Sequence, residues 1–270
     1  MSEGIHFTKM SGAGNDFIII DNRLKKIKNR LPDQARRLCD RHFSVGADGL
    51  ILLERSKKAD IRMRILNPDG SEAEMCGNGV RCLAKFTVSK KITKNKLSVE
   101  TLAGIIGVEV KKDTVKAKLV NPKDLKLDLA IAVDGSKGKF HFINTGVPHA
   151  VSLVNSIGEC DTARLGRAVR FHEYFAPKGT NVDFIAFSGP NAIDIRTYER
   201  GVEAETLACG TGSVAGALVA AALKDFKPPV RVKTAGGETL KIYFSKNGRG
   251  FSDVYLEGKV STNFEGRVPA

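Results

Sequence analysis

The chain has 270 residues, of which 42% are hydrophobic and 27% are charged, as in an ordinary folded globular protein. This length is enough for two medium-sized domains, each with its own core. No apolar run approaches the roughly 18 residues of a membrane-spanning helix, and the N-terminal segment has no hydrophobic signal region. We therefore expect no membrane association and a cytoplasmic location.

The net charge of +13 is compatible with nucleic-acid binding, with a solvated basic surface or with an anionic substrate. The lysines are spread along the chain, few aromatic residues lie among them, and Trp is absent. We therefore expect no nucleic acid as the main partner.

The five cysteines are an odd number without a C-x-x-C pair, and the five histidines are scattered. Neither a disulfide framework nor a metal site is expected.

The first half of the chain shows a readable order of elements. Short apolar and β-branched runs predict strands at residues 17–21, 50–53, 61–66, 97–100 and 105–110. A helix is expected to begin at an N-cap Asp33, with Ala35, Leu38 and Cys39 on one face. A second helix is expected directly behind Cys76, because apolar residues recur there at helical spacing.

The second half repeats this order. Strands are predicted at residues 150–154, 182–187, 192–198, 230–234 and 239–244, with helices behind an N-cap Asp161 and behind Cys209. The segment 113–138 has no counterpart in this comparison and is expected to link the two halves.

An internal duplication explains the repeated order. The segment IRMRILNPDGSEAEMCGNG, from Ile61, resembles IDIRTYERGVEAETLACGTG, from Ile193, at an offset of 131 to 133 residues. In this match Glu72-Ala73-Glu74 lies over Glu203-Ala204-Glu205, and Cys76 lies over Cys209. The offset is nearly the same in several other segments, which makes chance similarity a poor explanation.

The duplication predicts an α/β (α+β) fold with two pseudo-symmetric domains. Each would be a curved, mostly antiparallel sheet wrapped around a central helix. We expect the domains at residues 1–120 and 121–262, with the tail 263–270 as a segment that could return to the first domain. Ligand sites favour domain interfaces, so the active site is expected in the cleft between the domains.

Cys76 and Cys209 each precede a glycine-rich turn that opens a helix. Backbone N–H groups and the helix dipole at such a position stabilise a thiolate or bind a carboxylate. A single cysteine is more often a small buried apolar residue, but two at equivalent repeat positions indicate function. Two opposed thiols suit the inversion of a carbon α to a carboxylate, because one removes a proton and the other returns one. Such a reaction requires no cofactor.

At this point the chain resembles a known family. NPDGSEAEMCGNGVRC and ERGVEAETLACGTG are similar to the two signatures of the diaminopimelate epimerase family. KMSGAGNDFIIID, RHFSVGADG, NTGVPHAV and GTNVDF also resemble that family, so the similarity covers essentially the whole chain. The resemblance implies a homodimeric enzyme, independent of PLP, that interconverts LL- and meso-2,6-diaminopimelate. These small molecules are precursors of lysine and peptidoglycan.

The resemblance also assigns roles to individual residues. Cys76 and Cys209 match the acid and base, and His149 and Glu199 match residues that tune the thiols. Substrate-binding positions are matched by Asn15, Asn67, Asn78, Asn181, Glu199 and Arg200, and by the backbone of Gly77, Gly210 and Thr211. Two positions depart from the pattern of some members, Gly49 in place of Gln and Val147 in place of Asn, and both are left out of the site. The other cysteines, Cys39, Cys82 and Cys160, are interpreted as structural.

Three alternative functions remain open. The first is a proline racemase or hydroxyproline epimerase, because such enzymes also use two cysteines in C-G-x-G turns. The Asn of CGNG, the ERG segment and the SGAGND start favour diaminopimelate epimerase. The second alternative, motivated by the basic charge, is a nucleic-acid-binding protein with redox-active cysteines, for which salt-sensitive binding without turnover would be the sign. A purely structural protein is a third and weak alternative.

Overall fold

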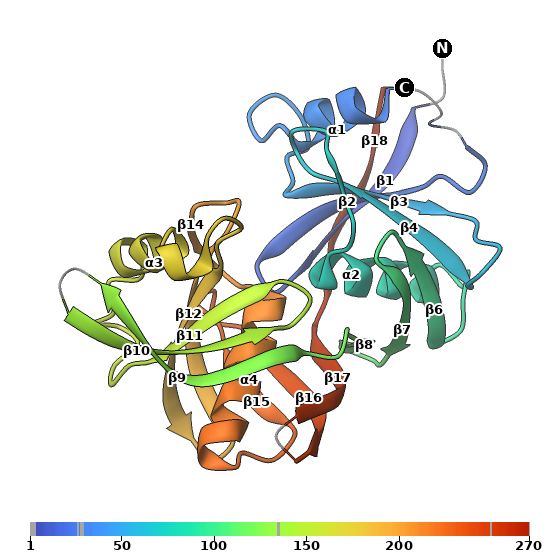
Figure 1. The fold of residues 1–270 in the computed structure, drawn as a ribbon. Coiled ribbons are helices and arrows are strands. Elements are labelled where there is room, and N and C mark those ends of the chain that lie inside the picture. Colours follow the sequence, from blue (N-terminus) through green and yellow to red (C-terminus); the bar gives the residue numbers. More distant parts are fainter. Residues whose placement is uncertain (1–3, 26, 28–29, 134–135, 249, 270) are drawn as a thin grey trace. The chain divides into compact units, whose positions relative to one another are not determined.

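The computed structural model describes residues 4–25, 27, 30–133, 136–248 and 250–269. The chain divides into two compact units, Met1–Lys118 with Gly258–Ala270, and Leu119–Glu257. In each unit, strands surround one central helix (Figure 1). The expected α/β class with two pseudo-symmetric halves is therefore confirmed.

The first unit has helices α1 (Leu31–Cys39) and α2 (Gly77–Ser89). Its strands are β1 (Ile5–Gly12), β2 (Asn15–Asp21), β3 (Gly49–Glu54), β4 (Ile61–Leu66), β5 (Glu72–Ala73), β6 (Lys96–Thr101), β7 (Gly104–Val110), β8 (Thr114–Lys118) and β18 (Ser261–Val268). Most neighbouring strands are antiparallel, but β2 pairs with β3, and β4 with β6, in parallel.

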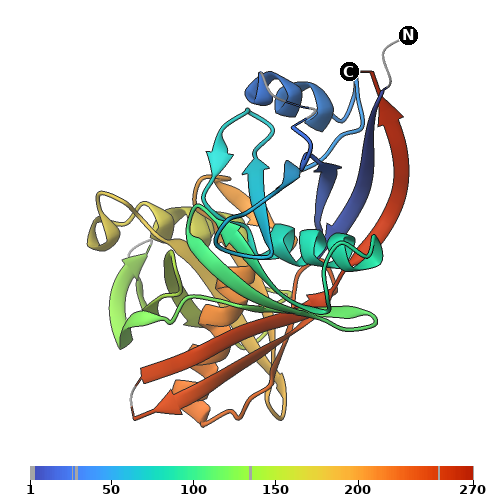
Figure 2. The same ribbon diagram turned by 90° about the vertical axis from the view of Figure 1, so that its right-hand side faces the viewer.

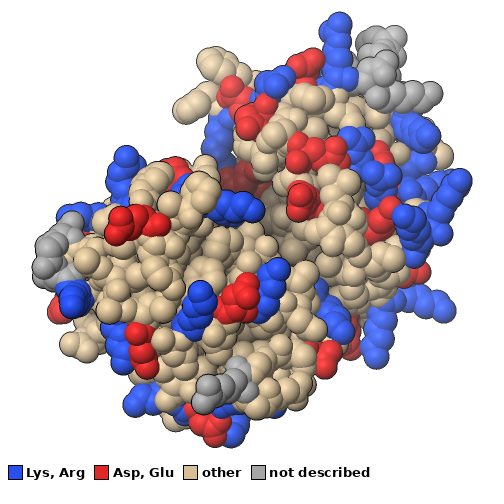
Figure 3. Space-filling model, viewed as in Figure 1, with Lys and Arg blue, Asp and Glu red and all other residues tan. Residues whose placement is uncertain are grey.

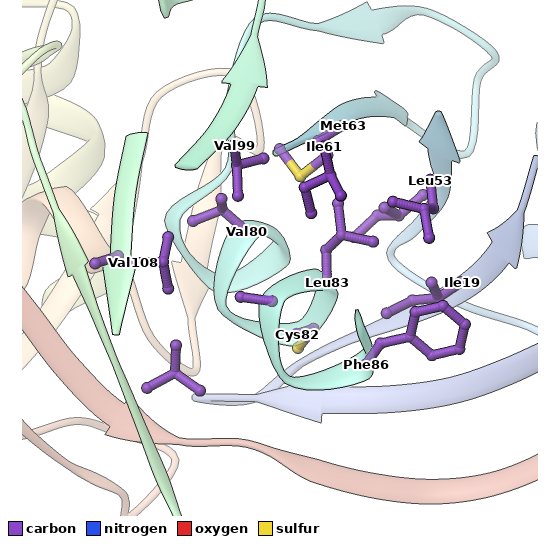
Figure 4. Close-up of a cluster of buried hydrophobic side chains, with 14 of the residues drawn as sticks. Ile19, Leu53, Ile61, Met63, Val80, Cys82, Leu83, Phe86, Val99 and Val108 are labelled. Carbon is purple, nitrogen blue, oxygen red and sulfur yellow. The ribbon is translucent and has the colours of Figure 1, made fainter. Parts of the chain in front are cut away.

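Helix α2 provides the centre of the first core. Val80, Leu83 and Phe86 lie three residues apart on this helix and are buried against the surrounding strands. Figure 4 shows them facing side chains that include Ile19 from β2 and Leu53 from β3. This packing fixes the axis of α2 and therefore the place of the turn at Cys76 where the helix begins.

The second unit has helices α3 (Thr162–Arg170) and α4 (Gly210–Lys224) and a short 3-10 helix at Glu173–Phe175. Its strands are β9 (Lys123–Val133), β10 (Ser136–Asn144), β11 (Pro148–Leu153), β12 (Asn181–Gly189), β13 (Ala192–Glu199), β14 (Ala204–Thr206), β15 (Val230–Lys233), β16 (Thr239–Asn247) and β17 (Gly250–Lys259). The pairing repeats that of the first unit, with parallel pairs between β11 and β12 and between β13 and β15.

The outermost strand of each unit lies where the sequence did not predict a strand. In the second unit β9 pairs with β10, and in the first unit β18 pairs with β1, with Ile5 opposite Val268. Figure 2 shows the red strand β18 running beside the blue strand β1. The C-terminal segment that belongs to the first unit thus begins at Gly258, earlier than the expected 263, because the whole of β18 joins this sheet.

The expected linker at 113–138 is wrong. This segment contains β8, β9 and the start of β10, and only residues 134–135 lie outside the described part. By the order of pairing, β8 is equivalent to β17 and β9 to β18. The counterpart is missing from the sequence comparison because β18 and most of β9 are exposed, which leaves little constraint on their residues.

The two expected helix starts have different outcomes. Asp161 is confirmed as the N-cap of α3, where its side chain accepts a hydrogen bond from the backbone of Arg164. Asp33 is not an N-cap, because α1 begins at Leu31 behind Arg30. Asp33 lies in the first helical turn, where a carboxylate also stabilises the helix through its dipole.

The strand register corrects one match in the repeat. Glu72 pairs with Leu66 in the first unit, and Glu205 pairs with Tyr198 at the equivalent place in the second. Glu72 is therefore equivalent to Glu205 and not to Glu203.

Among the described residues, none of the helices is long and apolar enough to cross a membrane.

Candidate active site

Cys76 is the N-cap of α2 and has an extended backbone conformation, with φ −136° and ψ 120°. Its Sγ accepts a hydrogen bond from the backbone N–H of Gly79 at 3.4 Å, and its side chain is partly exposed. The first N–H groups of a helix have no acceptor within the helix and carry its positive dipole end. Cys76 and the Gly77 backbone therefore lie at a place suited to a thiolate or a carboxylate.

A chain of amide hydrogen bonds joins two predicted substrate-binding residues. Asn78 Nδ2 donates to Asn15 Oδ1 at 2.6 Å, and Asn15 Nδ2 donates to Asp48 Oδ2 at 3.1 Å. At the other end the fully buried Arg81 donates to Asn78 Oδ1. Because an arginine can only donate and a carboxylate can only accept, the two ends fix the orientation of both amides.

Further charged side chains surround Asp48, the acceptor at the end of this series of hydrogen bonds. Arg41 contacts both Asp48 Oδ1, at 2.6 Å, and Asp16 Oδ1, at 2.8 Å. The buried Lys9 lies 2.9 Å from Asp16 Oδ2. Burial favours the protonated form of Asp16, but the hydrogen bonds from Arg41 and Lys9 outweigh it and lower the pKa of this carboxyl well below its usual range.

Asn67 lies in the turn between β4 and β5. Its backbone N–H donates to Ser71 O at 2.8 Å, its Nδ2 donates to Ser71 Oγ at 3.0 Å, and its carbonyl accepts from Gly70. These hydrogen bonds of Asn67 are internal to the turn. By contrast, Asn15, Cys76, Gly77 and Asn78 gather at the start of α2, and we call these four residues the first half-site.

Cys209 has the same place at the start of α4. It is the N-cap, and its Sγ accepts a hydrogen bond from Gly212 N at 3.4 Å and lies 3.4 Å from Thr211 Oγ1. Cys209 is only 8% exposed. Burial raises the pKa of its thiol far above the usual range, and the nearby carboxyl groups of Glu199 and Asp183 act in the same direction. The structure therefore favours a protonated Cys209.

A buried polar cluster lies beside Cys209. His149 Nδ1 is 2.7 Å from Asp183 Oδ2, and both side chains are fully buried. Asp183 Oδ1 accepts a hydrogen bond from Thr197 Oγ1 at 2.7 Å. Burial also raises the pKa of Glu199, and the nearby carboxyl group of Asp183 acts in the same direction. Three predicted residues, Cys209, His149 and Glu199, are therefore brought together.

The Asn181 side chain is hydrogen-bonded to the backbone of Arg200 and to that of Pro148, the residue before His149. Asn181 Oδ1 accepts from Arg200 N at 2.8 Å, and its Nδ2 donates to Pro148 O at 3.0 Å. The Arg200 guanidinium donates to Lys178 O at 3.2 Å and lines a pocket of about 750 Å³. The second half-site consists of His149, Asn181, Glu199, Arg200, Cys209, Gly210 and Thr211.

The repeat relates the two departures from the family pattern to retained amide residues. Strand pairing makes Asn15 equivalent to Val147 and Gly49 equivalent to Asn181. At these two positions each unit therefore has a single amide side chain, Asn15 in the first unit and Asn181 in the second. At Gly49 a Cβ atom would lie 3.2 Å from the carbonyl oxygen of Leu66, so the first unit has little room there for a side chain.

Sequence reasoning missed several residues that support the site. Asp48 and Arg81 orient the amides of the first half-site, and Asp183 and Thr197 contact His149 or its partner in the second. One usable signal was present: Asp183 is a lone charge within the apolar run NVDFIAF, and a charge buried in a strand usually has a specific partner.

No group of three or more His, Cys, Asp or Glu in the described part of the chain is arranged to hold a metal ion. On the face shown in Figure 3, Lys and Arg side chains are interspersed with Asp and Glu. This mixed face offers no continuous basic track of the kind that follows a nucleic-acid backbone.

The chain is similar to known proteins over nearly its whole length. The pattern that defines the diaminopimelate epimerase family matches residues 7–123 and 141–262. The chain belongs to the diaminopimelate epimerase family. It is 44% identical to the diaminopimelate epimerase of Aquifex aeolicus over 98% of both chains. It is 43% identical to that of Archaeoglobus fulgidus over 97% of this chain and 95% of the relative. The chain is therefore an enzyme of the isomerase class.

Solved structures share the fold of this diaminopimelate epimerase family member at low identity. A Bacillus anthracis phenazine biosynthesis protein of the PhzF family has a TM-score of 0.77 at 18% identity, covering 99% of this chain and 100% of its own. A probable proline racemase from Agrobacterium radiobacter has a TM-score of 0.71 at 17% identity, covering 98% of this chain and 92% of its own. These similarities support the two-domain fold.

Proposed function

We propose that this enzyme interconverts LL- and meso-2,6-diaminopimelate, using Cys76 and Cys209 as the acid and base. One observation carries the proposal: both residues are N-caps of equivalent helices, and in both the Sγ accepts the N–H three residues further on. The relatives at 44% and 43% identity are named diaminopimelate epimerase, which supports this substrate.

The proposed reaction moves protons at one carbon atom. Cys76, as the thiolate, takes the proton from the α-carbon, so the C–H bond breaks and an S–H bond forms. Cys209, as the thiol, then gives its proton to the opposite face of that carbon. The raised pKa of Cys209 supports this starting state. The reverse reaction uses the two groups in exchanged roles, and solvent restores the resting protonation.

The mechanism requires stabilisation of the charge that develops on the substrate carboxylate. The starts of α2 and α4 offer backbone N–H groups at Gly77, Gly210 and Thr211, and such fixed donors stabilise an oxyanion in the transition state. The proposal requires both half-sites to contact one substrate molecule. No PLP is required, because the helix termini replace its electron-withdrawing role.

The remaining predicted residues would hold the substrate. Asn15 and Asn78 each retain a further N–H beyond the bonds within their chain. Arg200 and Glu199 would engage the distal amino-acid end, since Arg200 lines the pocket of the second unit. Asn67 and Asn181 complete the set. As part of this proposal, the enzyme acts as a homodimer in the synthesis of lysine and peptidoglycan precursors.

Incubation with LL-diaminopimelate in heavy water tests the proposal. Deuterium should appear at the α-carbon as the meso isomer accumulates, measured by NMR and mass spectrometry. Cys76→Ala and Cys209→Ala should each abolish epimerisation. Cys160→Ala is the matched control, because Cys160 is also partly exposed but lies outside both half-sites, and it should retain activity.

Two outcomes would contradict the proposal. Full epimerisation by either half-site variant would exclude the two-thiol mechanism. Turnover of proline or hydroxyproline, without turnover of diaminopimelate, would instead assign the enzyme to the racemase alternative, whose fold it shares.

A further inference from the structure

The polar pair Asp183 and Thr197 has an apolar counterpart in the first unit. Pairing of β12 with β13 sets Asp183 opposite Thr197. Pairing of β3 with β4 sets Ile51 opposite Ile65 in the same position of the repeat. Two apolar side chains under the first cysteine turn are therefore replaced by a carboxylate and a hydroxyl under the second.

His149 completes this replacement. It lies next to Asn181 in the parallel pair of β11 and β12, as Phe17 lies next to Gly49 in the parallel pair of β2 and β3. His149 is therefore equivalent to Phe17. The second unit has three polar side chains where the first unit has Phe, Ile and Ile.

Glycines at the start of α2 and α4 show that these polar and apolar side chains lie next to the cysteine turns. A Cβ atom on Gly79 would lie 3.1 Å from Ile51 Cδ1. A Cβ atom on Gly212, at the equivalent place, would lie 2.3 Å from Asp183 Oδ1 and 3.2 Å from Thr197 Oγ1. Each glycine follows its cysteine by three residues and binds its Sγ. The difference between the units therefore lies directly beneath the reactive turns.

The fold does not need polar side chains at these positions. The first unit forms the same strand pairs and the same helix start with apolar residues. Burying a carboxylate and an imidazole is unfavourable unless they are paired, and apolar replacements of buried ion pairs are often neutral or stabilising. A role in the chemistry of the second half-site is the remaining explanation for the cluster.

The hydrogen bonds determine the tautomer of His149. One Asp183 oxygen accepts from Thr197 and the other lies 2.7 Å from His149 Nδ1. A carboxylate has no proton to give, so Nδ1 carries the hydrogen. His149 Nε2 is buried and has no hydrogen-bond partner among the described residues. In the neutral ring with hydrogen on Nδ1, this nitrogen presents a lone pair and no N–H group is left without an acceptor.

We propose that Asp183 is a positioning residue that holds His149 as the Nδ1–H tautomer, so that Nε2 is a fixed proton acceptor in the second half-site only. This inference rests on the proposed function. A fixed imidazole nitrogen accepts a hydrogen bond from a thiol or an ammonium group. The two thiols of the pseudo-symmetric enzyme are consequently unequal, because Phe17 offers no such acceptor in the first unit.

The test compares Asp183→Val and Asp183→Asn with the wild type, using protein labelled with ¹⁵N-histidine. Two-bond ¹H–¹⁵N spectra distinguish the imidazole tautomers, and His149→Gln assigns the signals. The wild type should show hydrogen on Nδ1 of His149. Both variants should lose this pattern. The valine side chain cannot accept a hydrogen bond, and the asparagine side chain, with its carbonyl bonded to Thr197, turns its NH₂ group toward the ring.

Activity provides the second measurement. In both variants kcat for epimerisation should fall by at least about 10-fold, since a general acid or base contributes roughly 10²- to 10⁴-fold, while KM changes by less than about threefold. Ile51→Val is the matched control at the equivalent position of the first unit. It should keep the wild-type His149 spectrum and a kcat within about twofold of the wild type.

The outcomes separate the two proposals. If His149 keeps hydrogen on Nδ1 in every folded variant, or if kcat is unchanged, the role of Asp183 is wrong. If Asp183→Val does not fold, the nearly isosteric Asp183→Asn decides. If the wild type does not epimerise diaminopimelate, the proposed function fails, and the spectra alone still decide whether Asp183 sets the tautomer.

Discussion

Arg196 and Glu205 form a bidentate ion pair in the second unit, with Nε to Oε1 at 2.7 Å and Nη2 to Oε2 at 2.6 Å. Arg64 and Glu72 form the same pair in the first unit at 2.8 and 2.7 Å. Each glutamate precedes its cysteine by four residues. Because each arginine lies on a long strand and each glutamate on a very short one, the pairs fix the segments that lead to Cys76 and Cys209.

A backbone hydrogen bond supports each of these segments from another strand pair. Ala103 N donates to Glu74 O at 3.3 Å, and Gly236 N donates to Leu207 O at 2.8 Å. Both acceptors lie two residues before the cysteine. The position of each thiol therefore depends on two contacts that are distant in sequence.

Loosening one ion pair should reduce turnover. In Arg64→Lys the ammonium group cannot bind both oxygens of Glu72, because lysine lacks the planar guanidinium fork. We expect kcat to fall by about 10-fold, since small displacements of reacting groups reduce rates by up to roughly 10²-fold. Steady-state epimerisation measures this effect. Arg36→Lys, in the exposed pair with Asp33, should change kcat by less than about twofold, and an equal loss in both would disprove a specific role.

Removing the acceptor of Asn15 should weaken substrate binding. Asp48→Ala leaves Asn15 Nδ2 without its carboxylate and releases the amide orientation that Arg81 and Asp48 fix together. We expect KM to rise by about fivefold or more, equivalent to one lost hydrogen bond of about 1 kcal/mol, with a smaller change in kcat. Asp60→Ala is the control, because Asp60 accepts from Ser98 outside the half-site. An unchanged KM in Asp48→Ala would argue against the amide chain.

Gly212→Ala should destabilise the protein, while Gly77→Ala should not. The new Cβ at Gly212 would lie 2.3 Å from Asp183 Oδ1, whereas nothing lies within 4 Å of a Cβ at Gly77. Overpacking typically costs about 1–3 kcal/mol. Urea unfolding should show a loss of this size for Gly212→Ala and less than about 1 kcal/mol for Gly77→Ala. Equal free energies of unfolding would contradict the packing beneath Cys209.

Stability should fall as the pH rises above 9. Burial raises the pKa of Cys39 from 9.0 to about 11. Above pH 9 the unfolded thiol therefore ionises while the folded thiol stays protonated, and this stabilises the unfolded state. Cys39→Ala removes this contribution, so its free energy of unfolding should fall less between pH 8 and 11 than that of the wild type, by about 2–3 kcal/mol.

Leu38→Ala controls for the lost packing at Cys39. Leu38 is buried on the same helix and does not titrate, so this variant should be less stable by a constant amount over the same pH range. If the free energy of unfolding of the wild type and of Cys39→Ala changed in parallel with pH, the raised pKa of Cys39 would be refuted.

Much of the central fold was predictable. The strands around α2 and α4 are apolar and alternate with clear turns, so 61–66 was predicted with the observed bounds, and most others within two residues. The outer strands β9 and β18 were not predicted, because long exposed stretches carry no hydrophobic periodicity. Their place is decided by pairing with β10 and β1.

The sequence by itself determined the duplication, the two Cys-Gly helix starts and the family, because these are local patterns that recur at a constant offset. Only the tertiary structure decided which side chains support each thiol. His149, Asp183 and Thr197 come from three different strands. Arg81, on a helix, contacts Asn78, and Asp48, just before a strand, contacts Asn15. Such contacts leave no periodic pattern in the sequence, because strand register decides which side chains meet. Only the register shows that polar side chains in the second unit lie where the first unit has apolar ones.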